Sequence, residues 1–261
     1  MSDFLHCTPA AFGKPVHRLG LALSFGIDEK GVREAADAGI NYFLWTQMRT
    51  GAGTPGLRDV LKRDREGNVV CAGPTLGYFP GAIRKGCEKA LRKLGVEYLD
   101  VFQLYWLGVG SAWTESTISE LLALKEEGKV RAIGVSIHDR ERAGRLAADS
   151  PLDMLMLRYN AAHPGAERDV FPHLPGKKRA VVAYTATSWR KLLSAPSGWT
   201  GPVPTAADCY RFCLSSAHVD VVLSGPASAE QLRENLKGLS KGPLTPEEDA
   251  WMRAFGREVH G

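Results

Sequence analysis

The stretch LRKLGVEYLDVFQLYW, residues 91–106, decides the fold, because it combines the end of a helix with the buried strand that follows it. Apolar residues three and four apart lead up to Gly95, a residue type that ends helices, and an apolar run then begins. The same strand-and-helix unit recurs along the chain. The expected strands are 17–25, 40–46, 68–74, 98–106, 130–138, 152–160, 179–187 and 219–227.

Helices are expected between these strands, and several begin with an Asp, Ser or Thr cap. They are 28–39, 80–95, 117–129, 139–150, 205–216 and 228–240, followed by a further helix at 245–259. Eight strands alternating with helices predict an α/β protein of one domain, residues 1–261, folded as a (β/α)8 TIM barrel with an extra C-terminal helix. A doubly wound open sheet is the alternative, but no G-x-G-x-x-G follows the first strand. Long irregular segments at 163–178 and 192–204 are expected at the C-terminal face, where active sites form in barrels.

Composition excludes several classes of function. The chain has 33 basic and 29 acidic residues, a net charge of +4, and no basic stripe interleaved with aromatics, which argues against nucleic-acid binding. No apolar run is long enough to cross a membrane and no secretory signal pattern is present, so a cytoplasmic protein is expected. The five cysteines suit reduced thiols, and Cys209 and Cys213, one turn apart, are expected to pack in the core and to bind no metal.

Six motifs in a fixed order carry a resemblance to a known family. They are GIN at 39–41, LGVEYLDVFQLYW at 94–106, GKVRAIGVS at 128–136, YN at 159–160, AYTA at 183–186 and SGPASAEQLRENL at 224–236. In this order and spacing the chain resembles the aldo-keto reductase superfamily. The resemblance implies a TIM barrel and descent from NADP(H)-dependent carbonyl reductases.

The resemblance also implies a catalytic tetrad of Asp, Tyr, Lys and His, with the tyrosine as the acid that protonates the carbonyl oxygen. In register, the Asp position holds Leu44 and the Tyr position falls near Arg49. The Lys position holds Gly73 and the His position holds Tyr105. Leu44 and Gly73 carry no charge that tunes the pKa of a tyrosine. The sequence therefore predicts a divergent member of the family that lacks the tetrad, and ordinary carbonyl reduction is not expected.

The cofactor positions are conserved only in part. Where the family holds the nicotinamide amide with Ser, Asn and Gln, this chain has Ser136, Ile137 and Met156. Tyr184 stands where the family stacks an aromatic ring on the nicotinamide. The start of the last barrel helix, with Ser224, Gly225 and Ser228, is expected to receive a phosphate on its backbone N–H groups. NADP binding is therefore a possibility that the resemblance leaves open.

Strand alternation predicts which side chains line the barrel mouth. Gln103 and Tyr105 share one parity on their strand, and Arg158 and Asn160 share it with Met156 two strands further along the chain. Together with Ser136 and Tyr184 they form a predicted polar cluster. The candidate catalytic residues are Tyr105, Arg158 and His163, and the candidate substrate-binding residues are Gln103, Asn160, Trp45 and Trp106.

Each candidate also has a structural alternative. Tyr105 alternatively fills the volume left by a lost cofactor, and His163 alternatively braces its loop, as does His138 after the fifth strand. Tryptophans pack in cores or rims more often than in pockets. Arg158 needs either an anionic ligand or an acidic loop residue such as Glu167 or Asp169, because a guanidinium turned into a barrel must be paired or solvated.

Three functions are consistent with these residues. The first is a small-molecule enzyme with repurposed chemistry, of the proton-transfer, isomerase or lyase type, acting on a small anionic substrate. The second is an NADP(H)-dependent oxidoreductase with an atypical acid, Tyr105. The third is a non-catalytic ligand-binding or regulatory protein.

Overall fold

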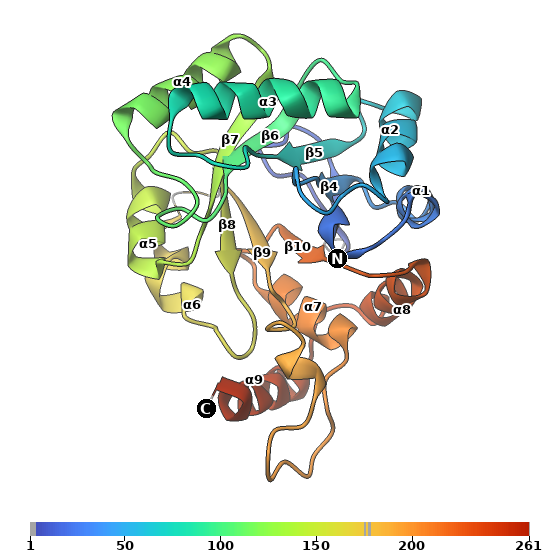
Figure 1. Cartoon of the computed structure of the whole chain (residues 1–261). Coiled ribbons are helices and arrows are strands. Elements are labelled where there is room, and N and C mark those ends of the chain that lie inside the picture. The colour runs from blue at the N-terminus through green and yellow to red at the C-terminus, as the bar shows by residue number, and fades with distance from the viewer. Residues whose placement is uncertain (1–3, 175, 177–178, 261) are drawn as a thin grey trace.

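The computed structural model describes residues 4–174, 176 and 179–260, and it contains a closed barrel of eight parallel strands (Figure 1). The strands follow the order β10-β3-β4-β5-β6-β7-β8-β9, so that each sequential strand pairs with the next and the last closes on the first. The predicted TIM barrel is confirmed. The strands are β3 (Leu19–Ala22), β4 (Tyr42–Leu44), β5 (Val69–Ala72), β6 (Leu99–Leu104), β7 (Val130–Ile137), β8 (Met154–Arg158), β9 (Ala180–Tyr184) and β10 (Val221–Ser224).

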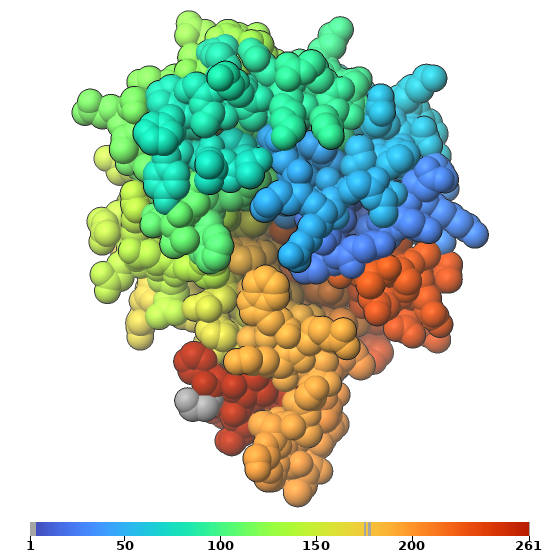
Figure 2. Space-filling view, viewed as in Figure 1, coloured from blue at the N-terminus to red at the C-terminus, as the bar shows by residue number. Residues whose placement is uncertain are grey.

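Helices surround the barrel, and the extra C-terminal helix lies at one end of the molecule beside the segment that joins β9 to the next helix (Figures 1 and 2). Short 3-10 turns follow β3, α6 and β9, at Leu23–Phe25, Phe171–His173 and Lys191–Leu193. The α-helices are α1 (Glu29–Asp37), α2 (Thr54–Arg63), α3 (Pro80–Leu94), α4 (Glu115–Glu126), α5 (Arg140–Ala148), α6 (Ala166–Asp169), α7 (Ala206–Ser215), α8 (Ala229–Leu239) and α9 (Pro246–His260).

Two helices were not expected from the sequence. Helix α2 lies in a segment whose Pro55 and Gly56 suggest a turn, but proline is tolerated in the first helical turn. A Cβ on Gly56 would lie 2.3 Å from the carbonyl oxygen of Glu29, so glycine is required for the close packing of α2 on α1. The short helix α6 falls inside the segment 163–178, which is therefore not fully irregular; residues 175, 177 and 178 of it lie outside the described part of the chain.

An N-terminal hairpin closes the bottom of the barrel. Strands β1 (His6–Cys7) and β2 (Val16–His17) pair antiparallel, and the ring of Phe12 between them lies 5.4 Å from the ring of Tyr42 in β4. Phe12 and Val16 pack with the side chains that fill the barrel interior. The interior is thus a packed core, and chemistry is confined to the opposite, C-terminal face.

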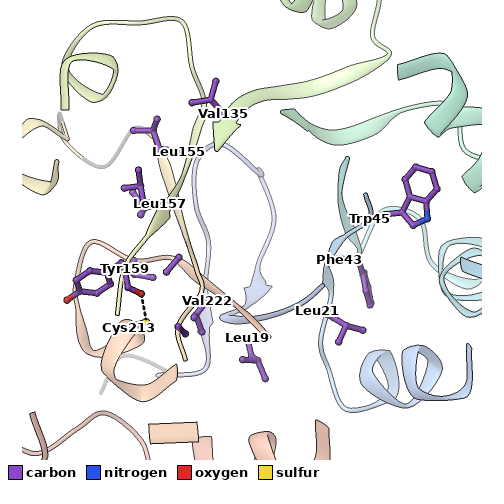
Figure 3. Close-up of a cluster of buried hydrophobic side chains, with 14 of the residues drawn as sticks. Leu19, Leu21, Phe43, Trp45, Val135, Leu155, Leu157, Tyr159, Cys213 and Val222 are labelled. Carbon is purple, nitrogen blue, oxygen red and sulfur yellow. Dashed lines mark hydrogen bonds between the residues drawn. The ribbon is translucent and has the colours of Figure 1, made fainter. Parts of the chain in front are cut away.

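A second, larger core lies between the strands and the helices (Figure 3). Outward-facing residues of the strands, such as Leu21, Phe43 and Leu155, meet the apolar faces of the helices there. Both Cys209 and Cys213 are buried free thiols in this layer, as expected, and the Cys213 thiol donates to the carbonyl oxygen of Tyr159 at 3.1 Å. In the described part of the chain no helix is long and apolar enough to span a membrane.

Candidate functional site at the barrel mouth

Three polar side chains stand next to one another where β7, β8 and β9 end. Arg158 is the last residue of β8 and pairs in register with Tyr184, the last residue of β9. His138 follows the end of β7, and Ser136 of that strand pairs with Met156 of β8. The parallel register of the three strands therefore brings the imidazole, the guanidinium and the phenol to one edge of the barrel mouth.

Tyr184 and His138 are joined directly. The Tyr184 hydroxyl lies 2.9 Å from His138 Nε2, and the ring centroids are 5.6 Å apart. Burial lowers the pKa of His138 and the positive charge of Arg158 lowers it further, which favours the neutral imidazole. Burial raises the pKa of Tyr184, whereas Arg158 opposes that rise. The pair is thus a neutral phenol hydrogen-bonded to a neutral imidazole, with one cation acting on both.

Arg158 has no acidic partner in the part of the chain that the structure describes. The two acids that could have paired with it are engaged elsewhere. Glu167 accepts from the Tyr159 hydroxyl at 2.6 Å and forms an ion pair with Arg253 at 2.8 Å. Asp169 forms ion pairs with Arg140 at 2.8 Å and with Arg168. A half-buried guanidinium without a carboxylate has the hydrogen-bond donors and the charge that pair with an anion.

Tyr105 is not part of this edge. Its hydroxyl is buried and has no hydrogen-bond partner among the described residues, and its ring packs with the barrel interior, where a Cβ on Gly73 would lie 2.6 Å from it. Gln103 is fully buried and reaches only the sulfur of Met156, with its own side-chain oxygen unpaired. Both side chains turn inward as expected; Gln103 is fully buried and Tyr105 is half-buried. The geometry agrees with the volume-filling alternative for Tyr105 and does not support its use as an acid.

Replacing Tyr105 with phenylalanine tests this placement. The unpaired hydroxyl of Tyr105 costs desolvation free energy, so its removal is expected to leave the free energy of unfolding unchanged or to raise it by about 1 kcal/mol. The measurement is urea unfolding of both proteins. A loss of more than about 1 kcal/mol would show that the hydroxyl is paired in solution.

His163 and Asn160 brace the loop after β8. The Asn160 side chain donates to the carbonyl oxygen of Thr185 at 2.7 Å and accepts from the His163 backbone N–H at 2.9 Å. The His163 ring lies edge-on to His260 of α9, with 4.8 Å between centroids. Burial, with Arg158 as the next cause, lowers the pKa of His163 to about 4. That value does not suit the predicted role as an acid or base near pH 7, and the loop-bracing alternative fits the contacts.

The two tryptophans predicted to bind substrate lie in different environments. Trp45 is 3% exposed and its indole N–H donates to the Thr54 hydroxyl at 2.9 Å, so it belongs to the outer core and not to the mouth. Trp106 is 54% exposed and its ring lies 6.3 Å from that of His138. Trp106 has a positive φ of 54°, an uncommon conformation for a bulky residue that often marks functional loops.

Only some of the residues predicted to bind a dinucleotide are placed to contact one. The Ser136 hydroxyl accepts from the Trp106 backbone N–H at 2.8 Å, and the buried Ser224 hydroxyl is bonded to Tyr210 at 3.1 Å. A Cβ on Gly225 would lie 2.3 Å from the ring of Phe25, which therefore covers that glycine. The Ser224 hydroxyl also accepts from the Asn235 amide at 3.2 Å and is thus fully engaged, whereas the Ser136 hydroxyl only accepts and keeps its O–H as a donor.

Two other groups do fit a dinucleotide. Ser228 caps α8, and the first turn of that helix presents backbone N–H groups suited to a phosphate. The half-buried Tyr184 ring offers an aromatic face at the mouth.

His138 is a candidate functional residue that was not among the predicted site residues. Its position directly after a strand was visible, but exposure on its own does not distinguish a functional histidine from a surface one. Only the hydrogen bond to Tyr184, 46 residues further along the chain, does so.

Known proteins resemble this chain in sequence. The profile of the Aldo/keto reductase family matches residues 72–192. The NADH-specific methylglyoxal reductase of Escherichia coli K12 is 24% identical over 198 residues, which are 62% of this chain and 60% of that protein. A second E. coli methylglyoxal reductase, YeaE, is 30% identical over 102 residues, 38% of this chain and 35% of its own length. The matches thus span less than two thirds of these relatives.

Solved structures resemble it over nearly the whole chain. The holo form of an aldo-keto reductase from Bacillus halodurans superposes with a TM-score of 0.80 at 21% identity, covering 96% of this chain and 95% of that one. The glycerol dehydrogenase of Gluconobacter oxydans gives a TM-score of 0.79 at 21% identity, with 100% and 98% covered. At this identity the likeness establishes the fold.

Proposed function

We propose that this chain, whose residues 72–192 match the profile of the Aldo/keto reductase family, is an oxidoreductase of small anionic carbonyl compounds in which Tyr184, assisted by His138 and Arg158, is the acid. The observation that carries the proposal is the edge at the ends of β7, β8 and β9, where a cation without a carboxylate stands beside a bonded Tyr–His pair. The relatives named as methylglyoxal reductases favour this reaction class over the proton-transfer chemistry considered first.

The substrate class follows from the surroundings of Arg158. Its planar guanidinium matches a carboxylate with two parallel hydrogen bonds. Exposed aromatic rings of Phe25, Trp106 and Trp189 stand on segments that follow the C-terminal ends of β3, β6 and β9. A charged group with an apolar wall is typical of a small-molecule site. The proposed substrate is therefore a carboxylate-bearing carbonyl compound with an apolar body.

The proton has a defined route in this proposal. The Tyr184 hydroxyl donates its proton to the carbonyl oxygen as negative charge develops there, and the neutral His138 imidazole donates an N–H hydrogen bond to the phenolate across their 2.9 Å contact. A proton from solvent then restores the phenol. Arg158 stabilises the phenolate that forms in between, because it already opposes the rise in the pKa of Tyr184. This is the tuning that the family's lysine gives its tyrosine.

A nicotinamide dinucleotide would be held here by the face of the Tyr184 ring and by the first turn of α8 behind Ser228, and it would supply the hydride. The Ser224 hydroxyl contributes nothing to that binding, because it both donates and accepts within the protein, and Ser136 offers only its O–H. We therefore expect weak affinity for the dinucleotide compared with a barrel whose polar groups all face the ligand.

A matched pair of ketones tests the proposal. Phenylpyruvate carries a carboxylate where phenylacetone carries a methyl group, so NADPH or NADH consumption is expected with the first and not with the second. Tyr184→Phe should lower kcat at least a hundredfold, roughly the contribution of a general acid. Tyr98→Phe, which makes the same change directly before β6 at the opposite end of the barrel, serves as the control and should keep kcat within about threefold. Equal turnover of both ketones, or none with phenylpyruvate, would contradict the proposal.

The fully engaged hydroxyl of Ser224 favours one alternative, a proton-transfer enzyme without a dinucleotide that uses the same Tyr184–His138 pair. Deuterium incorporation at the acidic carbon of phenylpyruvate in D2O, followed by proton NMR without added cofactor, separates it from the oxidoreductase. Exchange that depends on Tyr184 in the absence of NADPH consumption would favour the alternative.

A further inference from the structure

A second cleft lies outside the barrel, between α2 and α3. It has a volume of about 470 Å³ and is lined by the loop that joins β4 to α2, by the first turns of α2, and by one face of α3. This cleft is separate from the candidate site at the barrel mouth, because Arg158, His138 and Tyr184 are not among the residues that line it. Its volume lies in the range of roughly 300 to 1,000 Å³ typical of small-molecule sites.

Among the described residues, four cations and no acid line this cleft. They are Arg49 from the loop, Arg58 from α2, and Lys89 and Lys93 from α3. Lys89 and Lys93 are one turn apart, so their side chains project from the same helix face. None of the four has an ion pair in the part of the chain described. Four cations around one cleft repel one another unless an anion is bound between them.

The acids nearest in sequence are occupied elsewhere. Asp59, next to Arg58, forms an ion pair with Arg33 of α1 at 2.7 Å. Glu88, next to Lys89, forms an ion pair with Lys129 at 3.3 Å. The charge of the cleft is therefore not balanced by the side chains that flank it.

The walls of the cleft are held in place by their own hydrogen bonds. The Thr54 hydroxyl accepts from the Trp45 indole and donates to the carbonyl oxygen of Thr50 at 2.6 Å. The Gln47 amide donates to the carbonyl oxygens of Gly86 at 2.9 Å and Gly73 at 3.2 Å, which ties the loop to α3. The neutral polar groups are thus used for the frame, and the four cations remain for a ligand.

We propose that this cleft binds a small molecule that carries a diphosphate group. Two guanidinium forks match phosphate oxygens in bidentate pairs, and two ammonium groups add point charges on a second side. A diphosphate brings several negative charges in a span that one cleft of this volume encloses, whereas a single carboxylate leaves most of the positive charge unbalanced. The proposal does not depend on the function of the barrel mouth.

Calorimetry with inorganic pyrophosphate at low ionic strength tests the proposal on the whole protein. Arg58→Gln and Lys93→Gln are each expected to weaken binding about five- to twentyfold, with the double variant weaker still. Arg92→Gln is the matched control: the residue is exposed, lies next to Lys93 on α3 and does not line the cleft, so binding should change less than about twofold. Binding should be unchanged in Arg158→Met, which removes the cation of the mouth.

Saturable pyrophosphate binding that is weakened by Arg58→Gln and Lys93→Gln but kept in Arg92→Gln and Arg158→Met supports the cleft. Equal weakening by Arg92→Gln would show a diffuse effect of net charge, and loss of binding in Arg158→Met would assign it to the mouth. Either of these, or the absence of saturable binding up to millimolar pyrophosphate, overturns the proposal. All four substitutions lie outside the buried core, so the thermal midpoint without ligand checks that each variant is folded.

Discussion

Gly73→Ala is expected to destabilise the protein by roughly 3 kcal/mol or to prevent folding. Gly73 follows β5, and a Cβ there would lie 2.2 Å from the carbonyl oxygen of Gln103 and 2.6 Å from the ring of Tyr105. The first of these neighbours is the backbone of β6, which cannot retreat without disturbing the barrel ladder. The measurement is urea unfolding, or soluble yield where the variant does not accumulate.

Gly81→Ala is the control for that substitution. Gly81 lies in the first turn of α3, and no atom is within 4 Å of the position that its Cβ would take. Alanine there should leave the free energy of unfolding unchanged or raise it by up to about 1 kcal/mol, because alanine is the better helix former. A stable Gly73→Ala protein would mean that Tyr105 and β6 move apart easily, and the position would then be open to a longer side chain.

The expected cost at Gly73 also explains which residue types fit at positions 73 and 105. The family resemblance puts a lysine at this position and a histidine at Tyr105. Here the Tyr105 ring occupies the space beside Gly73, so the two residues fit each other, and a lysine introduced at position 73 alone is expected to fail for the same steric reason.

The fold was predictable because its signals are local. Each strand-and-helix unit carries its own apolar pattern, so the patterns of the eight units were enough to predict the barrel. The exceptions were elements whose reason for existing is tertiary. Gly56 in α2 reads as a helix breaker until its contact with Glu29 of α1 is known. The hairpin of β1 and β2 has only two residues per strand, and its burial depends on the barrel above it.

The site was predictable in direction but not in depth. Strand parity correctly turned Gln103 and Tyr105 inward, yet parity does not say how far along the barrel axis a side chain lies. The Tyr105 ring packs against the barrel interior because Gly73, without a side chain, leaves room for it. Similarly, the sequence could not show whether Glu167 is available to pair with Arg158. Glu167 pairs instead with Tyr159 and with Arg253, which is 86 residues further along the chain.

Arg158→Met is expected to weaken the binding of phenylpyruvate about ten- to a hundredfold while the protein stays folded. A charge-assisted hydrogen-bonded pair in a partly buried site is worth about 1.5 to 3 kcal/mol, and each 1.4 kcal/mol corresponds to about tenfold in affinity. Methionine keeps much of the apolar stem and removes the planar fork. Arg158→Lys should recover only part of the affinity, because an ammonium group offers a point charge without the bidentate geometry.

The fold should survive Arg158→Met because no acid in the described part of the chain pairs with that guanidinium, so its removal leaves no buried carboxylate unpaired. Calorimetry with phenylpyruvate and with phenylacetone measures the effect, and the neutral ketone, which has no carboxylate for the fork, should bind equally to all three proteins. The substitution should also alter Tyr184: without the cation, nothing in this edge opposes the effect of burial, so the pKa of the phenol rises further and any turnover of phenylpyruvate should fall by more than the loss of affinity explains. Unfolding of Arg158→Met, or unchanged affinity for phenylpyruvate, would instead assign the guanidinium a role in holding the barrel mouth together.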